Sequence, residues 1–231
     1  MNQIKRLVFF GCSVTYGKGL DESTRLDEVW TKHLCDNLGV DHLNLGLSGC
    51  SNHDIYKHIQ RYLAHELDSI HDDNFKDGDF IIIALTGLTR QSTYYEIPNE
   101  SSHGWQQKFK TGIKALQDLC ELLEHNKKSY LLCESFVNYH TFLSDVLDSR
   151  YTKNFLCWGE EDTTLYDLLC NTWGKKNDDD PDERLNYEHL HDTSDSELFL
   201  PCSHPSPAGH EKIAEELTPI ISEHLAAFSD K

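Results

Sequence analysis

Residues 7–17 read Leu-Val-Phe-Phe-Gly-Cys-Ser-Val-Thr-Tyr-Gly, an apolar run that changes at Gly11 into small and polar residues. An apolar run that ends in glycine is typical of a buried strand followed by a tight turn. Ser13 comes directly after this strand end, and open α/β sheets bind ligands at the carboxyl edge of their strands. The stretch therefore predicts an α/β fold with Ser13 beside a ligand site.

A histidine stands near the other end of the chain, where residues 204–210 read His-Pro-Ser-Pro-Ala-Gly-His. A serine hydroxyl is inert at neutral pH until a base takes its proton, so Ser13 and His204 are a candidate nucleophile–base pair. His210 lies inside the expected terminal helix at 207–228, and we interpret it as a helix-surface residue rather than the base.

Between these ends the chain alternates strand and helix patterns. Strands are expected at 41–45, 80–85 and 130–136, and helices at 29–38, from Ser51 or Asn52 to 70, and at 105–123. The run at 80–85 is apolar on both faces, as in a central parallel strand. Repeated β-α units with covered strands predict one domain over residues 1–231, a three-layer α/β/α sandwich.

The alternation breaks between about residues 137 and 197, which include the acidic run Asn-Asp-Asp-Asp-Pro-Asp-Glu at 177–183. We interpret this region as an insertion that shapes substrate access, and the acidic run as a solvated loop. A calcium site is the alternative for the run, although its spacing matches no known calcium loop.

The charge and the apolar content of the chain limit the kinds of partner that we expect. The 231 residues carry 39 acidic and 21 basic side chains, a net charge of −18, which argues against nucleic acid or an anionic membrane as a partner. No apolar stretch approaches the roughly 20 residues of a membrane span. No signal-peptide pattern precedes the first strand. We therefore expect a cytoplasmic protein, or a virus-encoded one that leaves by lysis or inside a particle.

Neither the cysteines nor the histidines indicate a metal. The eight cysteines form no Cys-x-x-Cys pair, and we expect reduced thiols. His53, His58 and His65 are interpreted as surface histidines of one helix. The sequence thus predicts neither a metal nor a cofactor.

A third segment, Asn-Leu-Gly-Leu-Ser-Gly-Cys-Ser-Asn at 44–52, completes an ordered set with the first two. The set resembles the SGNH (GDSL-type) hydrolase superfamily. Its block I is Gly-Asp-Ser-x-x-x-Gly, block II is Asn-x-Gly-x-Ser-Gly-x-Thr, and block V is Asp-x-x-His followed by Pro. The Gly-Cys-Ser form of block I resembles a Gly-Cys-Ser-Phe-Thr-Tyr-Gly variety common among phage-encoded and environmental members. The matching positions are Gly11, Ser13 and Gly17, then Asn44, Gly46, Ser48 and Gly49, then His204 and Pro205.

The resemblance implies a flavodoxin-like sheet of five parallel strands in the order 2-1-3-4-5. It also implies that Ser13 is the nucleophile and His204 the base. The oxyanion hole would combine the N–H groups of Ser13 and Gly46 with a block III side chain. Asn52, beside block II, is a further candidate for substrate binding.

Block III departs from the family, because residues 84–91 read Ala-Leu-Thr-Gly-Leu-Thr-Arg-Gln and hold no asparagine. Thr86 or Thr89 could donate through a hydroxyl instead, and Thr86 is nearer the strand end. Arg90 either binds a substrate carboxylate or phosphate or is a surface arginine.

Block V also departs, because Pro201 and Cys202 occupy the positions where the family has an aspartate. A backbone carbonyl could accept the Nδ1–H of His204, or Asp192 or Asp195 could reach it from the preceding loop. We favour the carbonyl and a Ser–His dyad, since the apolar segment 198–202 should hold its backbone firmly.

The resemblance thus implies a serine esterase that cleaves a small O-acyl ester such as an acetyl ester, either short-chain or on a carbohydrate. Its partner would be a small-molecule or glycan substrate. The missing aspartate and asparagine favour an alternative, a weak or inactive SGNH-fold protein that binds sugars or belongs to a virion.

Overall fold

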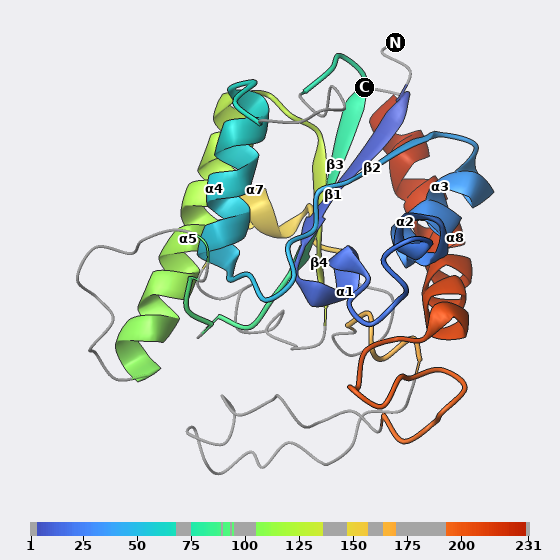
Figure 1. The fold of residues 1–231 in the computed structure, drawn as a ribbon. Coiled ribbons are helices and arrows are strands. Elements are labelled where there is room, and N and C mark those ends of the chain that lie inside the picture. The colour runs from blue at the N-terminus through green and yellow to red at the C-terminus, as the bar shows by residue number, and fades with distance from the viewer. Residues whose placement is uncertain are drawn as a thin grey trace.

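The chain folds around a parallel sheet whose strands run in the order β2-β1-β3-β4 (Figure 1). This computed structural model describes residues 4–67, 75–88, 90–92, 94, 105–135, 147–156, 164–169 and 193–229. The strands are β1 (Arg6–Gly11), β2 (Asp41–Asn44), β3 (Asp79–Leu85) and β4 (Tyr130–Glu134).

The predicted strand order is confirmed, but the expected fifth strand is reduced to one bridge in the described part of the chain. Phe155 forms a parallel bridge with Leu132 of β4. The Leu132 N–H donates to the Asn154 carbonyl at 2.8 Å, and the Leu156 N–H donates to the Leu132 carbonyl at 2.7 Å. A short parallel segment therefore occupies the place of the fifth strand.

Alternation along β1 explains the three layers. Val8 and Phe10 belong to one apolar cluster, and Leu7 and Phe9 to another, because successive side chains of a strand point to opposite faces. The first cluster lies under α4 (Asn52–Leu63) and α5 (Trp105–His125), and the second under α3 (Trp30–Leu38) and α8 (Pro207–Ser229). Figure 1 shows these two helix pairs on opposite sides of the sheet, so the predicted α/β/α sandwich is confirmed.

Short local signals fix the ends of two helices. Gly39 ends α3 with a φ of 66°, a conformation that glycine adopts without strain. Ser51 and Asp54 form a capping box at the start of α4, in which each side chain accepts the other residue's backbone N–H. The predicted extension of α4 to residue 70 is wrong, because the helix ends at Leu63.

Three shorter helices complete the described fold: α1 (Ser13–Tyr16), α2 (Arg25–Glu28) and α7 (Ser149–Thr152). Most of the predicted insertion, with its acidic run, lies outside the described residues. Within the described ranges, no helix is both long enough and apolar enough to cross a membrane.

Candidate active site

The turn from β1 into α1 sets the position of Ser13. A Cβ on Gly11 would collide with the Thr15 side chain and would lie 2.9 Å from the Ala84 carbonyl oxygen, so the turn needs glycine here. Ser13 is the first residue of α1, and its N–H therefore has no acceptor within the helix. Ser13 is 7% exposed, and among the described residues no hydrogen bond engages its hydroxyl. The serine thus has an uncommitted hydroxyl at the carboxyl edge of the sheet.

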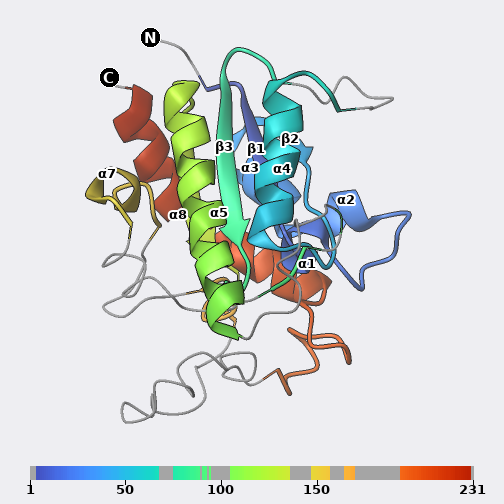
Figure 2. The ribbon, with the colours of Figure 1, turned by 90° about the vertical axis from the view of Figure 1, so that its left-hand side faces the viewer.

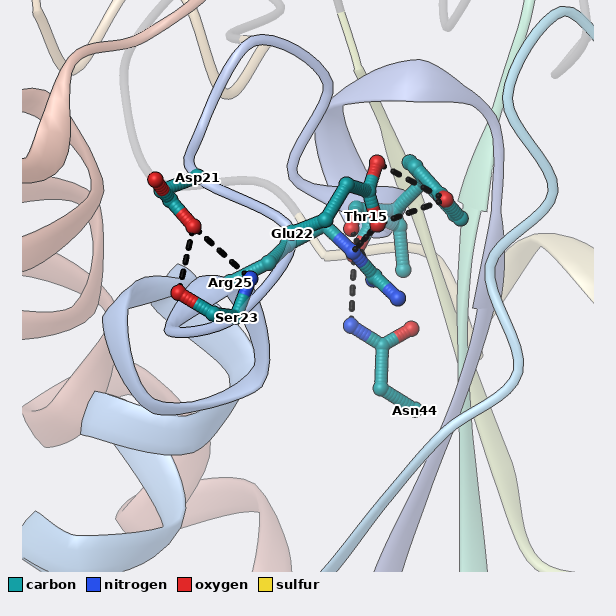
Figure 3. A network of polar contacts seen from close by, with 7 residues as sticks. Thr15, Asp21, Glu22, Ser23, Arg25 and Asn44 are labelled. Carbon is teal, nitrogen blue, oxygen red and sulfur yellow. Dashed lines mark hydrogen bonds and ion pairs between the residues drawn. The ribbon is translucent and has the colours of Figure 1, made fainter.

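A polar network holds the chain that follows α1 (Figure 3). The guanidinium of Arg25 donates to the Tyr16 carbonyl at 2.6 Å and to Glu22 at 3.1 Å, and it lies over the Tyr16 ring at 3.9 Å. The Asp21 carboxylate accepts from the Ser23 N–H at 2.8 Å in the same loop. These contacts fasten the C-terminal end of the short helix that carries Ser13.

Asn44, at the end of β2, ties block II to α1. Its Nδ2 donates to the Thr15 carbonyl at 2.6 Å, the contact drawn in Figure 3, and its Oδ1 accepts the Gly46 N–H at 2.9 Å. A Cβ on Gly46 would lie 2.7 Å from the Tyr16 nitrogen, so this glycine allows block II to pass against the helix backbone. The Gly46 N–H that the resemblance assigns to the oxyanion hole is donated to Asn44 in this structure.

Asn52 and Thr86 form a buried pair that links block II to block III. The Asn52 amide accepts the Thr86 N–H at 2.9 Å and donates to the Thr86 carbonyl at 2.8 Å. The two residues are 2% and 3% exposed. Asn52 therefore fixes the chain after β3, and its amide is used by Thr86 rather than presented to a substrate. Thr89, the other candidate donor, lies outside the described residues.

Arg90 reaches across the same junction. Its Nη1 donates to the Thr86 hydroxyl at 3.0 Å and approaches the Cys50 carbonyl at 3.5 Å. The Thr86 oxygen is thus an acceptor for Arg90, and the hydroxyl keeps its own proton for a donor role. The guanidinium therefore lies between Cys50 of block II and Thr86 of block III.

A tight loop presents His204 before α8. The Leu200 N–H donates to the His204 carbonyl at 2.8 Å, and Ser203 has a left-handed φ of 59°. The Tyr166 hydroxyl donates to the Ser203 carbonyl at 2.7 Å. The Gly209 N–H donates to the Ser206 hydroxyl at 3.1 Å, which caps the helix that follows. The loop is therefore held from both ends.

The imidazole of His204 is oriented by backbone. Its Nδ1 lies 3.1 Å from the Cys202 carbonyl oxygen, so Nδ1 carries the proton and Nε2 is left as the basic nitrogen. Partial burial lowers the pKa of His204, and this keeps the base neutral. The exposed Asp195 carboxylate accepts the Glu197 N–H at 2.9 Å instead of contacting His204. Asp192 lies outside the described residues.

Two observations bring the serine and histidine segments together. A Cβ on Gly19, just after α1, would lie 2.7 Å from Leu200 Cδ1 and 3.3 Å from Cys202 Sγ. Figures 1 and 2 show α1 and the orange segment before α8 at the same end of the sheet. No hydrogen bond joins Ser13 and His204 in this structure.

The structure corrects the interpretation of two histidines. His210 is fully buried rather than on the helix surface, and its Nδ1 accepts the Trp30 N–H at 3.3 Å. Burial lowers the pKa of His210 to about 3. His58 is also largely buried and packs edge-on against the ring of Phe10, with the ring centres 5.6 Å apart. His65 is exposed, as expected.

A polar pair at the end of β4 escaped the sequence analysis. Glu134 is 5% exposed and Ser135 is fully buried. Cys12, which replaces the family's aspartate, donates from its thiol to the Ser135 hydroxyl at 3.8 Å. Two polar residues directly after an apolar strand are the signal that could have revealed them.

Comparison with known proteins bears on the fold. No family model and no curated protein matches the chain. Among solved structures, a protein of the lipolytic G-D-S-L family from Desulfitobacterium hafniense DCB-2 matches with a TM-score of 0.55 and 16% identity, covering 94% of this chain and 99% of that one. The fold is that of the G-D-S-L hydrolases.

Two esterases share this G-D-S-L fold. The psychrotrophic esterase EstA from Pseudoalteromonas sp., solved with monoethylphosphonate as inhibitor, has a TM-score of 0.52 and 15% identity, covering 96% of this chain and 99% of its own. The acetyl xylan esterase Est2A from Butyrivibrio proteoclasticus has a TM-score of 0.53 and 13% identity, covering 97% of this chain and 64% of its own. At these sequence identities the comparisons establish the fold but not the reaction, which depends on the site residues.

Proposed function

We propose that this chain is a serine esterase that cleaves a small O-acyl ester, with Ser13 as nucleophile and His204 as base. The observation that carries the proposal is the contact between His204 Nδ1 and the Cys202 carbonyl at 3.1 Å. It supplies the orientation that a triad takes from an aspartate, and it leaves Nε2 to accept the serine proton. The G-D-S-L fold supports the same assignment.

The reaction follows from these roles. Ser13 Oγ attacks the ester carbonyl carbon while its proton passes to His204 Nε2. The same proton then moves to the leaving alcohol oxygen as the acyl C–O bond breaks. Water repeats the two steps on the acyl-enzyme and releases the acid. The Ser13 N–H and the Thr86 hydroxyl are the proposed donors to the oxyanion, each typically worth about 3–4 kcal/mol of barrier.

The finer proposal is that the acyl group is an acetyl group on a carbohydrate. An acetyl xylan esterase among the proteins of the same fold supports this choice. A panel of acetylated xylo- and manno-oligosaccharides, with acetate release as the readout, tests it. Acetate release from simple phenyl esters but from no glycan would contradict the carbohydrate assignment. The proposal that the protein is an esterase would still stand.

Reaction with a fluorophosphonate probe and hydrolysis of p-nitrophenyl acetate test the catalytic roles. Ser13→Ala should abolish labelling, and Ser13→Ala and His204→Ala should each lower kcat by roughly 10⁴-fold or more. Ser222→Ala, at an exposed serine of α8, serves as the matched control and should change neither readout. Labelling at Cys12, or full activity in Ser13→Ala, would contradict the proposal.

One observation favours the second candidate, a G-D-S-L-fold protein that binds its ligand without turnover. The Gly46 N–H is donated to Asn44, so it is not directed at an oxyanion. The same assays separate the two functions, because a binding protein would retain ligand affinity and would neither hydrolyse the ester nor react with the probe.

A further inference from the structure

A turn at residues 164–169 is anchored to the carboxyl end of β4. The Leu165 N–H donates to the Glu134 carbonyl at 2.9 Å, and the Tyr166 N–H donates to the Ser135 carbonyl at 3.3 Å. Leu165 is fully buried in the apolar cluster that lies under α3 and α8. Backbone hydrogen bonds and a buried side chain therefore fix this turn to the sheet.

The side chain of Tyr166 extends from the turn to the loop before α8. Its ring packs edge-on against the ring of Phe199, with the ring centres 5.5 Å apart, and its hydroxyl donates to the Ser203 carbonyl at 2.7 Å. Tyr166 is 8% exposed, so this hydrogen bond is shielded from water. The carbonyl that it holds belongs to the peptide group between Ser203 and His204.

Ser203 has a backbone conformation that needs support from its surroundings. Its φ of 59° lies in the left-handed region, which a residue with a Cβ adopts only at a cost in free energy. The carbonyl of the preceding residue, Cys202, is the one that lies 3.1 Å from His204 Nδ1. A change in the backbone at Ser203 would therefore move the Cys202 carbonyl away from the imidazole.

Tyr166 also links the two halves of the proposed catalytic pair. Cys12, directly before the proposed nucleophile, donates from its thiol to the Ser135 hydroxyl at 3.8 Å. The Ser135 carbonyl accepts the Tyr166 N–H, and the Tyr166 hydroxyl reaches Ser203, directly before the proposed base. A continuous series of hydrogen bonds thus joins the segment of the nucleophile to the segment of the base.

We propose that Tyr166 is a positioning residue for the base: its hydroxyl holds the peptide group before His204, so that the Cys202 carbonyl keeps the imidazole proton on Nδ1. This inference rests on the proposed esterase function. A neutral imidazole carries its proton on either nitrogen, and only the Nδ1–H form leaves Nε2 free to take the proton of Ser13. Tyr166 and the Cys202 backbone together do what an aspartate does in a triad.

The variant Tyr166→Phe tests the inference, because it removes the hydroxyl and keeps the ring that packs on Phe199. With p-nitrophenyl acetate, kcat should fall by about tenfold, the loss expected for one shielded hydrogen bond. KM should change by less than about twofold, since the hydroxyl is bound to the Ser203 carbonyl and not to the substrate. A thermal melt verifies that the variant is folded.

The matched control is Tyr130→Phe. Tyr130 is 1% exposed and lies at the opposite end of β4, where its hydroxyl donates to Glu124 at 3.4 Å. This variant also removes one hydroxyl from a buried tyrosine, and it should leave kcat unchanged whatever its effect on Tm. A loss of kcat in Tyr166→Phe no larger than in Tyr130→Phe would overturn the inference.

The tautomer of His204 gives a readout that a general loss of stability would not move. Nitrogen-15 NMR at a pH where the imidazole is neutral distinguishes the ring nitrogen that carries the proton, and His204→Gln identifies the signals. Nδ1 should carry the proton in the wild-type protein and in Tyr130→Phe. In Tyr166→Phe part of the population should change to the Nε2–H form, because the Cys202 carbonyl is no longer held in place.

The same spectra separate failure of this inference from failure of the esterase function. If the wild-type protein neither hydrolyses esters nor reacts with the fluorophosphonate, the esterase function is wrong. The tautomer still tests the role of Tyr166, since it depends on the loop and not on a substrate. A change of tautomer in Tyr166→Phe supports the inference, and an unchanged Nδ1–H form in that variant overturns it, with or without turnover.

Discussion

Asn52→Ala should destabilise the protein strongly, because it removes two buried hydrogen bonds at once. The amide of Asn52 serves both the N–H and the carbonyl of Thr86, at 2.9 and 2.8 Å, and the two residues are 2% and 3% exposed. A buried backbone group left without a partner costs about 1–3 kcal/mol. The expected loss is therefore roughly 2–6 kcal/mol in the free energy of unfolding.

Urea unfolding and a thermal melt measure this loss. For a domain of this size, 1 kcal/mol lowers Tm by roughly 2–4 °C, so the midpoint of the melt should fall by about 4–24 °C. Asn37→Ala is the matched control: the exposed Asn37 amide donates to the Thr218 hydroxyl at 3.1 Å, and its loss should cost less than about 1 kcal/mol.

The same variant separates a positioning role from substrate contact. Asn52 holds Thr86, the proposed oxyanion donor, so kcat for ester hydrolysis should fall while the fluorophosphonate still labels Ser13. A melt that moves no further for Asn52→Ala than for Asn37→Ala would refute the reasoning. Asn52 would then be available to bind substrate.

Three further outcomes are expected. Asp195→Asn should change kcat by less than about tenfold, against roughly 10⁴-fold for a triad aspartate, since its carboxylate accepts the Glu197 N–H; a larger loss at unchanged Tm would give it the third catalytic role. Gly46→Ala should destabilise the fold by about 1–3 kcal/mol and slow ester hydrolysis, because its Cβ would lie 2.7 Å from the Tyr16 nitrogen; a variant with wild-type Tm and kcat would contradict this close approach. Burial lowers the pKa of His210 to about 3, so the unfolded state binds a proton that the folded state refuses, and stability is lost as pH falls from about 6.5 towards 3, by up to about 1.4 kcal/mol per pH unit. His210→Asn should flatten this slope in urea titrations, and an unchanged slope would show that His210 does not carry it.

The sequence alone determined the layers and some of the helix ends, and these features follow from local chemistry. The order of the described strands was implied by the resemblance of the three sequence blocks to a known superfamily. The alternation from Leu7 to Phe10 sets which side chains pack against each helix layer. The capping box of Ser51 and Asp54, only four residues long, sets the start of α4. The end of α4 at Leu63 was missed because the apolar spacing continues beyond the point where the backbone leaves the helix.

Only the tertiary structure decided what the polar residues do. His210 lies in an ordinary amphipathic pattern, and it is buried because α8 packs on the start of α3, where the Trp30 N–H needs an acceptor. Asn52 turns inward because the chain after β3 presents it with a free N–H and carbonyl. The loop after α1 and the loop before α8 meet at Gly19 and Cys202, which are 183 residues apart in sequence. Patterns in a sequence report which side chains avoid water, whereas hydrogen-bond partners and charges depend on which distant segments the packed layers bring together.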